Sequence, residues 1–445
     1  MAQEIIKPLT VKGQNPIKYE FLGRLSAADL NSSLSEEVVM TANGNTSLYN
    51  LFNEKVNGQQ AAKPFNADLG AHNAVDFYRL TYNTKIPETK SSYQVSGLLA
   101  IPALQQKDRQ RTSAKIPLLS WQHGTILDPK DAPSELIRNG SIMRQFYGAP
   151  WSSETLFNVV RFAGNGYALA AADYIGNGIS DATQAYAVKD ATIQTTKDMI
   201  TGATMVIKSL RGTTRDPISK LALNGWSQGG INTQWLGTAL QNDGILVNKQ
   251  SQSAAPTDLK QTASYWFNDY PGDPNWLTCC VPLLLGSYEK YYGLKGLMQA
   301  AVKSDYIDIA NKIYNKQIDW SKVAPAPEGQ GLLGLPAKPI DMINQSFIDD
   351  FNAGKGDFYA RVKANSALEE KYNHPTRFYG GSADNVVPEE ISVNLPVNFQ
   401  QGLGSDLSSG LDMGPAATHR GTFLSSLFGS TVSPGSDILT WFNSH

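Results

Sequence analysis

The stretch Gly225-Trp226-Ser227-Gln228-Gly229-Gly230 decides how the rest of the sequence is interpreted. It follows a short apolar run, residues 221–224, and precedes an amphipathic run, residues 231–240. A strand, a tight turn with a serine between glycines, and a helix form the context in which Gly-x-Ser-x-Gly marks a nucleophilic serine. The turn holds the serine in a strained conformation that exposes its hydroxyl. The motif alone is weak evidence in a chain with 38 glycines, so Ser227 is judged by whether the sequence supplies its partners.

Alternating and solid apolar runs around this stretch predict an α/β fold. Two runs alternate apolar and polar residues, which indicates an antiparallel pair of strands at a sheet edge, and they are residues 75–83 and 93–102. Later runs are apolar throughout, as expected for strands covered on both faces, and they are residues 116–121, 167–173 and 221–224. Helical patterns over residues 154–163 and 186–210 separate them, which predicts a mostly parallel central sheet.

The second half of the chain predicts an insertion into this sheet. Residues 244–248 are expected to form the next strand, and residues 376–379 the one after it. A strand–helix–strand crossover takes roughly 30 residues, so this interval is far too long for one. Its surplus is rich in Trp, Tyr and apolar helical patterns, and we expect a mainly helical cap over residues 258–370. Residues 74–257 and 371–445 then form the core, and residues 1–73 an N-terminal extension packed on it.

Composition limits the possible partners and locations. The chain of 445 residues has 38 basic and 40 acidic residues and no basic stripe, which argues against a nucleic-acid partner. Only 18% of the residues are charged, below the roughly 25% usual for soluble domains. This polarity without charge favours a secreted or periplasmic protein, although the N-terminus lacks the apolar core of a signal peptide and a cytoplasmic location stays open. No apolar run approaches the roughly 20 residues that a membrane-spanning helix needs.

A serine hydroxyl becomes a good nucleophile only when a base removes its proton, and a third group must hold that base. On a turn of this kind the partners follow the serine in the order acid, then histidine. The sequence holds five histidines: His72, His123, His374, His419 and His445. The first two precede Ser227, and the last is the final residue, where chains usually fray. His374 and His419 remain as candidates for the base.

The acid is expected on a loop directly after a sheet strand. Residues 377–388 have this form, with two glycines after the strand and Asp384 in the loop. If Asp384 is the acid, chain order excludes His374 and leaves His419 as the base. Glu389 and Glu390 are the next candidates for the acid. The competing interpretations are a turn aspartate and a helix-capping histidine.

Ester or amide chemistry at Ser227 also needs backbone N–H groups that stabilise the developing oxyanion. Gln228, at the start of the helix after the serine, is the first expected donor, and Thr125, after the strand at 116–121, is the second. Tyr174 and Ile175 follow the next strand at the same sheet end, so they are expected to border the substrate pocket together with Trp226. A purely structural turn at residues 173–176 is an equal alternative.

Cofactor and metal signals are missing from the sequence, and we expect neither. The Gly-x-Gly at residues 176–178 lacks the rest of a dinucleotide fingerprint. Cys279 and Cys280 are adjacent and have no histidine arrangement around them that suggests a metal site. Two buried thiols are the simpler interpretation, and a vicinal disulfide in an oxidising compartment is the alternative.

With these residues assembled, the chain resembles the α/β hydrolases of the secretory lipase type, which include fungal lipase A-like enzymes and bacterial secreted esterases. The matching segments run from residue 121 to residue 421: Trp121-Gln-His-Gly-Thr125, Ala172-Asp-Tyr-Ile-Gly176, Gly225–Gly230, Ala255-Pro-Thr-Asp-Leu259, Gly381-Ser-Ala-Asp384 with Val386-Val-Pro388, and Thr418-His-Arg-Gly421. The resemblance implies Ser227, Asp384 and His419 as a triad, Gln228 and Thr125 as oxyanion donors, and a helical cap. Residues 1–73 and most of the cap match nothing.

The sequence therefore predicts an α/β-hydrolase fold and a serine carboxylic ester hydrolase that acts through an acyl-enzyme. The expected partner is a small-molecule, lipid or carbohydrate ester, and an aromatic cap suits sugars and acyl chains equally. A serine peptidase of the same fold, an esterase of the acetyl or feruloyl type acting on carbohydrate-linked esters, and a non-catalytic binding protein are the alternatives. Acyl-chain length and oligomeric state have no signal in the sequence.

Overall fold

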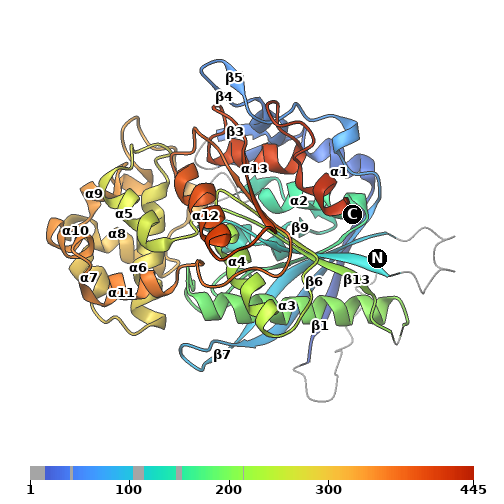
Figure 1. Ribbon diagram of the computed structural model, residues 1–445, viewed down its shortest axis with the longest axis horizontal. Helices are drawn as coiled ribbons and strands as arrows, with labels where there is room; N and C mark the ends of the chain where they lie inside the picture. The colour runs from blue at the N-terminus through green and yellow to red at the C-terminus, as the bar shows by residue number, and fades with distance from the viewer. Residues whose placement is uncertain (1–15, 41–43, 104–114, 147–152, 214, 445) are drawn as a thin grey trace.

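A nine-stranded sheet runs through the computed structural model, which describes residues 16–40, 44–103, 115–146, 153–213 and 215–444 (Figure 1). Its strands lie in the order β1 (Lys18–Leu25), β6 (Val75–Lys85), β7 (Ser92–Pro102), β12 (Ala168–Ala172), β8 (Ile116–Gln122), β13 (Ile218–Trp226), β14 (Lys249–Ser253), β15 (Thr376–Gly380) and β16 (Ser408–Asp412). The first three strands and the β7–β12 pair are antiparallel, and every pairing from β12 to β16 is parallel. The predicted mostly parallel sheet is confirmed.

Helices cover both faces of this sheet. One face carries α3 (Lys189–Leu210) and α4 (Gln228–Asn242), and the other carries α2 (Glu154–Arg161), α13 (His419–Phe428) and α14 (Ile438–Asn443). Successive strand residues point to opposite faces. Leu118 accordingly packs in the same cluster as Leu236 of α4, while Leu119 packs in the cluster of Phe423 of α13. This double burial explains why the central strands are apolar throughout. Helix α12 (Leu395–Gly402) packs beside β16.

The N-terminal residues extend the sheet and cover one of its faces. Strand β1 pairs with β6, so the predicted antiparallel pair lies one strand in from the edge. Helix α1 (Ala27–Ser33) and the single turns after it bury Leu30, Leu48 and Phe52 in the α13 cluster. Short ladders complete this region: β2 (Glu37–Met40), β3 (Gly44–Ser47) and β11 (Gln145–Phe146), β4 (Lys55–Val56) with β5 (Gln59–Gln60), and β9 (Ile137–Arg138) with β10 (Ser141–Ile142).

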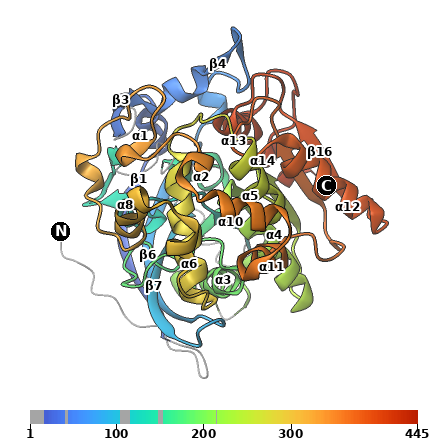
Figure 2. The ribbon, with the colours of Figure 1, turned by 90° about the vertical axis from the view of Figure 1, so that its left-hand side faces the viewer.

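The described residues between 258 and 370 fold into helices that gather at one end of the sheet (Figures 1 and 2). They are α5 (Leu259–Asn268), α6 (Cys280–Tyr291), α7 (Leu297–Ala301), α8 (Ser304–Tyr314), α9 (Pro339–Met342), α10 (Gln345–Asn352) and α11 (Gly356–Ala364). Their apolar cluster is continuous with Ile231 and Trp235 of α4 and with Val386 and Val387. The division of the chain into extension, core and cap stays a prediction.

The prediction of a strand at residues 244–248 is wrong. Leu246 is 83% exposed, and the strand is the polar segment β14, in which every residue is buried. Its side chains are paired inside the protein: Ser251 donates to the Asn224 side chain over 2.9 Å, and the Gln250 amide oxygen lies 3.1 Å from the His374 ring. Buried polar groups are tolerated when they are hydrogen-bonded. Because the strand therefore needs no apolar residues, hydrophobic patterning does not predict it.

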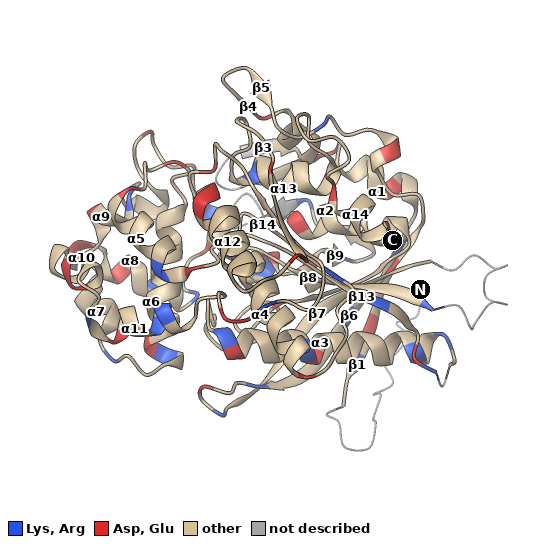
Figure 3. Ribbon diagram, viewed as in Figure 1, with Lys and Arg blue, Asp and Glu red and all other residues tan. Residues whose placement is uncertain are grey.

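Surface charge and thiols complete the description. Lys and Arg are interspersed with Asp and Glu along the ribbon (Figure 3). None of the described helices combines the length and the hydropathy needed to cross a membrane. Cys279 and Cys280 are free and buried, so they form no vicinal disulfide, and burial raises the pKa of the Cys280 thiol to about 12.

Candidate active site

Ser227 occupies the turn between β13 and α4 in a conformation that side chains rarely adopt. Its φ is 57° and its ψ is −126°, which is the kind of local strain that clusters at functional sites. The flanking glycines are required by contact: a Cβ at Gly225 would lie 2.1 Å from the Gly229 carbonyl oxygen, and a Cβ at Gly229 would lie 1.9 Å from the Gln122 carbonyl oxygen. The turn is therefore built as the sequence motif predicts.

His419 and Asp384 are brought together from two segments, the start of α13 and the loop after β15. The Nδ1 atom of His419, the first residue of α13, lies 2.8 Å from Oδ2 of Asp384, which follows β15. The other carboxyl oxygen, Oδ1, accepts the backbone N–H groups of Val386 at 2.8 Å and of Val387 at 2.9 Å. These three contacts fix the carboxyl group, whose side chain is fully buried.

The hydrogen bond to Asp384 determines which nitrogen of His419 is available. A carboxylate only accepts hydrogen bonds, so Nδ1 of the neutral ring carries the proton and Nε2 keeps its lone pair. Nε2 is buried and has no hydrogen-bond partner among the described residues. A buried polar atom without a partner is uncommon, and a free ring nitrogen is what a general base needs. The other candidate acids, Glu389 and Glu390, hydrogen-bond to Ser382 and Asn394 instead.

Trp226 connects the serine turn to the histidine helix. Its indole N–H donates to the His419 carbonyl oxygen over 3.1 Å, and its ring lies 5.0 Å from the imidazole and 4.9 Å from the Phe423 ring, between centroids. The side chain is buried. Trp226 is thus a packing partner of His419, and because it directly precedes Ser227, it connects the serine turn to α13.

The expected oxyanion donors lie on two segments beside the turn. Gln228 is the first residue of α4, and Thr125 follows β8. Neither backbone N–H donates to another described residue, which leaves both available to a ligand. The Thr125 hydroxyl is 2.9 Å from the Tyr186 hydroxyl, and this contact holds the segment in place.

Glu154, which the sequence does not predict as a site residue, places a buried carboxyl group against the same segment. Its Oε1 accepts the backbone N–H of Gly124, and its Oε2 has no partner among the described residues. Burial raises the pKa of Glu154 well above its ordinary value, which favours the neutral acid. In the sequence Glu154 looks like any acidic residue in the first turn of a helix, so no pattern marks it.

Tyr174 and Ile175, which follow β12, are buried side chains. Tyr174 stacks on the His123 ring, with 4.0 Å between centroids, and donates to the His123 carbonyl oxygen over 3.3 Å. Ile175 is buried in the cluster of α3. Burial lowers the pKa of His123 to about 4. The structure therefore gives both residues packing contacts.

A small apolar cavity lies beside Gln228. The space in it that a water molecule can reach measures about 20 Å³, enough for roughly one or two waters, and it lies between α4, α5 and α6. Its lining is almost entirely apolar and includes Tyr186, Ile231, Leu259, Ala263, Trp266 and Leu284. Among the described residues, no group of three or more His, Cys, Asp or Glu side chains is arranged to hold a metal ion.

Comparisons with known proteins find similarity in three dimensions alone. No protein-family model matches the sequence, and no curated protein sequence matches it significantly. A candidate hydrolase from Legionella pneumophila superposes with a TM-score of 0.68 at 17% identity, over 91% of this chain and 92% of that one. The rice cell wall degrading esterase LipA from Xanthomonas oryzae gives 0.63 at 18%, over 93% and 92%. Candida antarctica lipase A gives 0.53 at 15%, over 78% and 73%.

The parallel strands, the helices on both faces and the strained serine turn after β13 agree with these superpositions. Identities of 15–18% show a common fold and leave the reaction to be argued from the residues. The chain has the α/β-hydrolase fold that its sequence predicts.

Proposed function

We propose that this protein is a serine carboxylic ester hydrolase in which Ser227 is the nucleophile, His419 the general base and Asp384 the group that orients the base. The observation that carries the proposal is the hydrogen bond between His419 and Asp384, which leaves a buried, unpaired Nε2 on a helix packed against the serine turn through Trp226. A histidine used only for structure would have both ring nitrogens paired or exposed.

The proposed reaction has two halves. The Ser227 hydroxyl oxygen attacks the ester carbonyl carbon while Nε2 of His419 takes the hydroxyl proton, and the backbone N–H groups of Thr125 and Gln228 stabilise the oxyanion. The intermediate collapses as the imidazolium returns that proton to the leaving alcohol, and an acyl-enzyme remains. A water molecule then adds to the acyl carbon and gives its proton to Nε2. That proton returns to Ser227 as the carboxylic acid leaves.

The apolar side chains beside Gln228 support an apolar acyl group as the part of the substrate next to the serine, and the narrow cavity between them has to widen to admit it. An apolar lining stabilises an acyl or aryl group by roughly 25 cal/mol for each Å² removed from water. The polar groups of its described lining are few, and two of its hydroxyls are already paired, Tyr186 with Thr125 and Thr262 with the Asp258 carbonyl oxygen, so a sugar is better accommodated on the alcohol side of the ester. An esterase that acts on carbohydrate-linked esters is the second candidate, because LipA, a cell wall degrading esterase, has the same fold. A location outside the cytoplasm is part of the proposal, since only 18% of the residues are charged.

Hydrolysis of p-nitrophenyl esters of increasing chain length, beside aminoacyl and dipeptidyl anilides, tests the reaction class. We expect turnover of the esters, and turnover of anilides alone would make the protein a peptidase. Ser227→Ala should lower kcat by about 10⁴-fold or more, while Ser209→Ala, at an exposed position of α3, should leave it unchanged. Labelling of Ser227 in the native protein by a fluorophosphonate, located by mass spectrometry, identifies the nucleophile directly, and a native melting temperature of Ser227→Ala separates its loss from misfolding. Full ester turnover by Ser227→Ala would refute the assignment.

A further inference from the structure

Glu54, in the N-terminal part of the chain, contacts the residues on both sides of the candidate base. It follows the short helical turn Leu48–Asn53, and its carboxyl group reaches the start of α13. We propose that Glu54 is a positioning residue for His419, which gives residues 16–73 a role in the reaction. This inference rests on the proposed function.

The carboxyl group of Glu54 makes three hydrogen bonds to the neighbours of His419. Oε2 accepts from the Thr418 hydroxyl at 2.8 Å and from Nε of Arg420 at 3.2 Å, and Oε1 accepts from an Nη atom of Arg420 at 3.0 Å. The arginine contact is bidentate, the geometry that fixes orientation best. The two charged side chains are mostly buried, with 17% and 27% of their surface exposed for Arg420 and Glu54. Water therefore screens this pair less than an ordinary surface pair.

Thr418 transmits this contact to the histidine backbone. It is the N-cap of α13, and its hydroxyl oxygen accepts the backbone N–H of Gly421 at 3.0 Å. Because the hydroxyl proton goes to Glu54, the lone pairs of the same oxygen stay directed at the helix. Losing an N-cap hydrogen bond weakens the first turn of a helix. The first turn of α13, which carries His419, is thereby held by Glu54 outside the helix and by the N-cap hydrogen bond within it.

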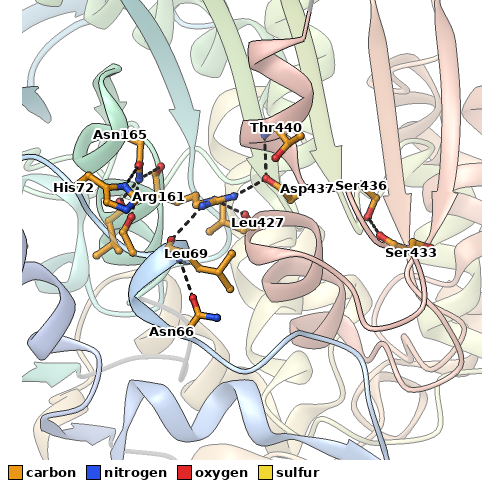
Figure 4. A network of polar contacts seen from close by, with 12 residues as sticks. Asn66, Leu69, His72, Arg161, Asn165, Leu427, Ser433, Ser436, Asp437 and Thr440 are labelled. Carbon is orange, nitrogen blue, oxygen red and sulfur yellow. Dashed lines mark hydrogen bonds and ion pairs between the residues drawn. The ribbon is translucent and has the colours of Figure 1, made fainter.

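The same N-terminal segment also holds the far end of α13. Lys63 donates its backbone N–H to the Gly429 carbonyl oxygen over 2.9 Å, and Ala62 pairs with Ser430. Arg161 of α2 joins the two segments, because its guanidinium donates to the carbonyl oxygens of Leu69 and Leu427 over 3.2 and 3.0 Å (Figure 4). Figures 1 and 2 both show the N-terminal segment lying along α13.

Glu54 acts on the reaction through geometry. It touches neither the imidazole ring nor Ser227 among the described contacts, so it is not a catalytic residue. Nε2 has to meet the serine hydroxyl at hydrogen-bond distance while Nδ1 stays on Asp384, and a displacement of about 1 Å can cost 10²-fold in rate. A released Thr418–Arg420 segment lets the ring move away from one of these two partners, whereas substrate binding beside Gln228 is left intact.

Steady-state kinetics of the full-length Glu54→Ala and Glu54→Gln variants test this role. We expect kcat to fall about 10- to 100-fold in Glu54→Ala and KM to change less than about twofold. The carboxamide of Glu54→Gln still accepts from Thr418, so its loss should be smaller. The matched control is Asp76→Asn, which removes the charge and one acceptor of the bidentate pair of Asp76 with Arg24 of β1, another contact of the N-terminal residues. We expect Asp76→Asn to keep kcat within about twofold, although its melting temperature shifts by about as much as that of Glu54→Ala.

The His419 Nδ1 proton, observed as a downfield NMR signal, reports its hydrogen bond to Asp384 without any turnover. We expect this signal to shift or broaden in Glu54→Ala and to stay unchanged in Asp76→Asn. Unchanged kcat and an unchanged signal in Glu54→Ala would overturn the inference while the proposed function stands. If Ser227→Ala instead kept full turnover, the proposed function would fail, and the NMR signal would still decide whether Glu54 positions His419.

Discussion

The most informative single substitution is Asp384→Asn, because the contacts of this side chain dictate what the new amide does. Oδ1 of Asp384 accepts two backbone N–H groups, from Val386 and Val387. The amide oxygen of the asparagine has to take that place, since the reverse orientation would leave buried N–H groups facing each other at about 1–3 kcal/mol each. The amide NH₂ then faces Nδ1 of His419 and donates to it.

This reversal moves the proton on the imidazole. Nδ1 becomes the acceptor, so the ring proton lies on Nε2, and Nε2 can no longer take the proton of Ser227. A wrong tautomer of this kind lowers kcat by about 10⁴-fold in serine hydrolases, or about 5 kcal/mol of transition-state stabilisation. Because the side chain keeps its size and its backbone contacts, the melting temperature should change little.

Initial rates on the best p-nitrophenyl ester, with active-site titration, provide the measurement. Glu389→Gln and Glu390→Gln are the controls, and both should keep kcat within about twofold. A kcat above about one tenth of the native value in Asp384→Asn, or a large loss in either glutamate variant, would refute the assignment of the acid.

Three further predictions concern stability. Gly229→Ala should prevent folding, because the new Cβ would lie 1.9 Å from a backbone oxygen. Its control, Gly402→Ala, places the Cβ where no atom lies within 4 Å and should keep the native melting temperature. A soluble, cooperatively melting Gly229→Ala variant would disprove the steric argument. The Glu154 carboxyl has a raised pKa in the folded state, so its stabilising effect is present below about pH 4.5 and is lost as the pH rises. Glu154→Gln should therefore gain stability relative to the native protein between pH 5 and 8 in urea titrations, and a pH-independent difference would contradict this. The pKa of His123 is about 4, so its contribution to the free energy of unfolding is present above about pH 6.5, and about 3 kcal/mol of that free energy is lost as the pH falls to 4. In His123→Gln the free energy of unfolding should fall less steeply over this pH range, and an equally steep fall would refute the prediction.

Patterns that depend on local chemistry were predictable from the sequence. The serine turn needs glycines at 225 and 229, and both positions leave no room for a Cβ. The strands β8, β12 and β13 are covered on both faces, so their apolar runs are unambiguous. The position of Asp384 after a strand, together with chain order and the small number of histidines, favours pairing it with His419 over Glu389 and Glu390, and the structure joins these two residues by a hydrogen bond.

Features that depend on distant partners could not be predicted. Strand β14 is buried although it reads Lys-Gln-Ser-Gln-Ser, because its hydrogen-bond partners come from other elements. Strand β16 carries mostly exposed residues and a glycine, so it has no apolar pattern at all. Glu154 is distinguished by its burial against Gly124, and Glu54 by its contact with α13. None of these partners lies close in sequence, where periodicity and motifs operate.

The contact between Glu54 and Arg420 spans 366 positions of the chain. During synthesis the N-terminal residues leave the ribosome first, while α13 is among the last helices to emerge. Until then Phe52, which packs 5.1 Å from the Phe428 ring between centroids, has no partner there. Such long-range closure is slow and leaves apolar surface exposed in the nascent chain. The proposed ester hydrolysis should therefore appear only once synthesis is nearly complete, and the unfinished chain is expected to bind chaperones.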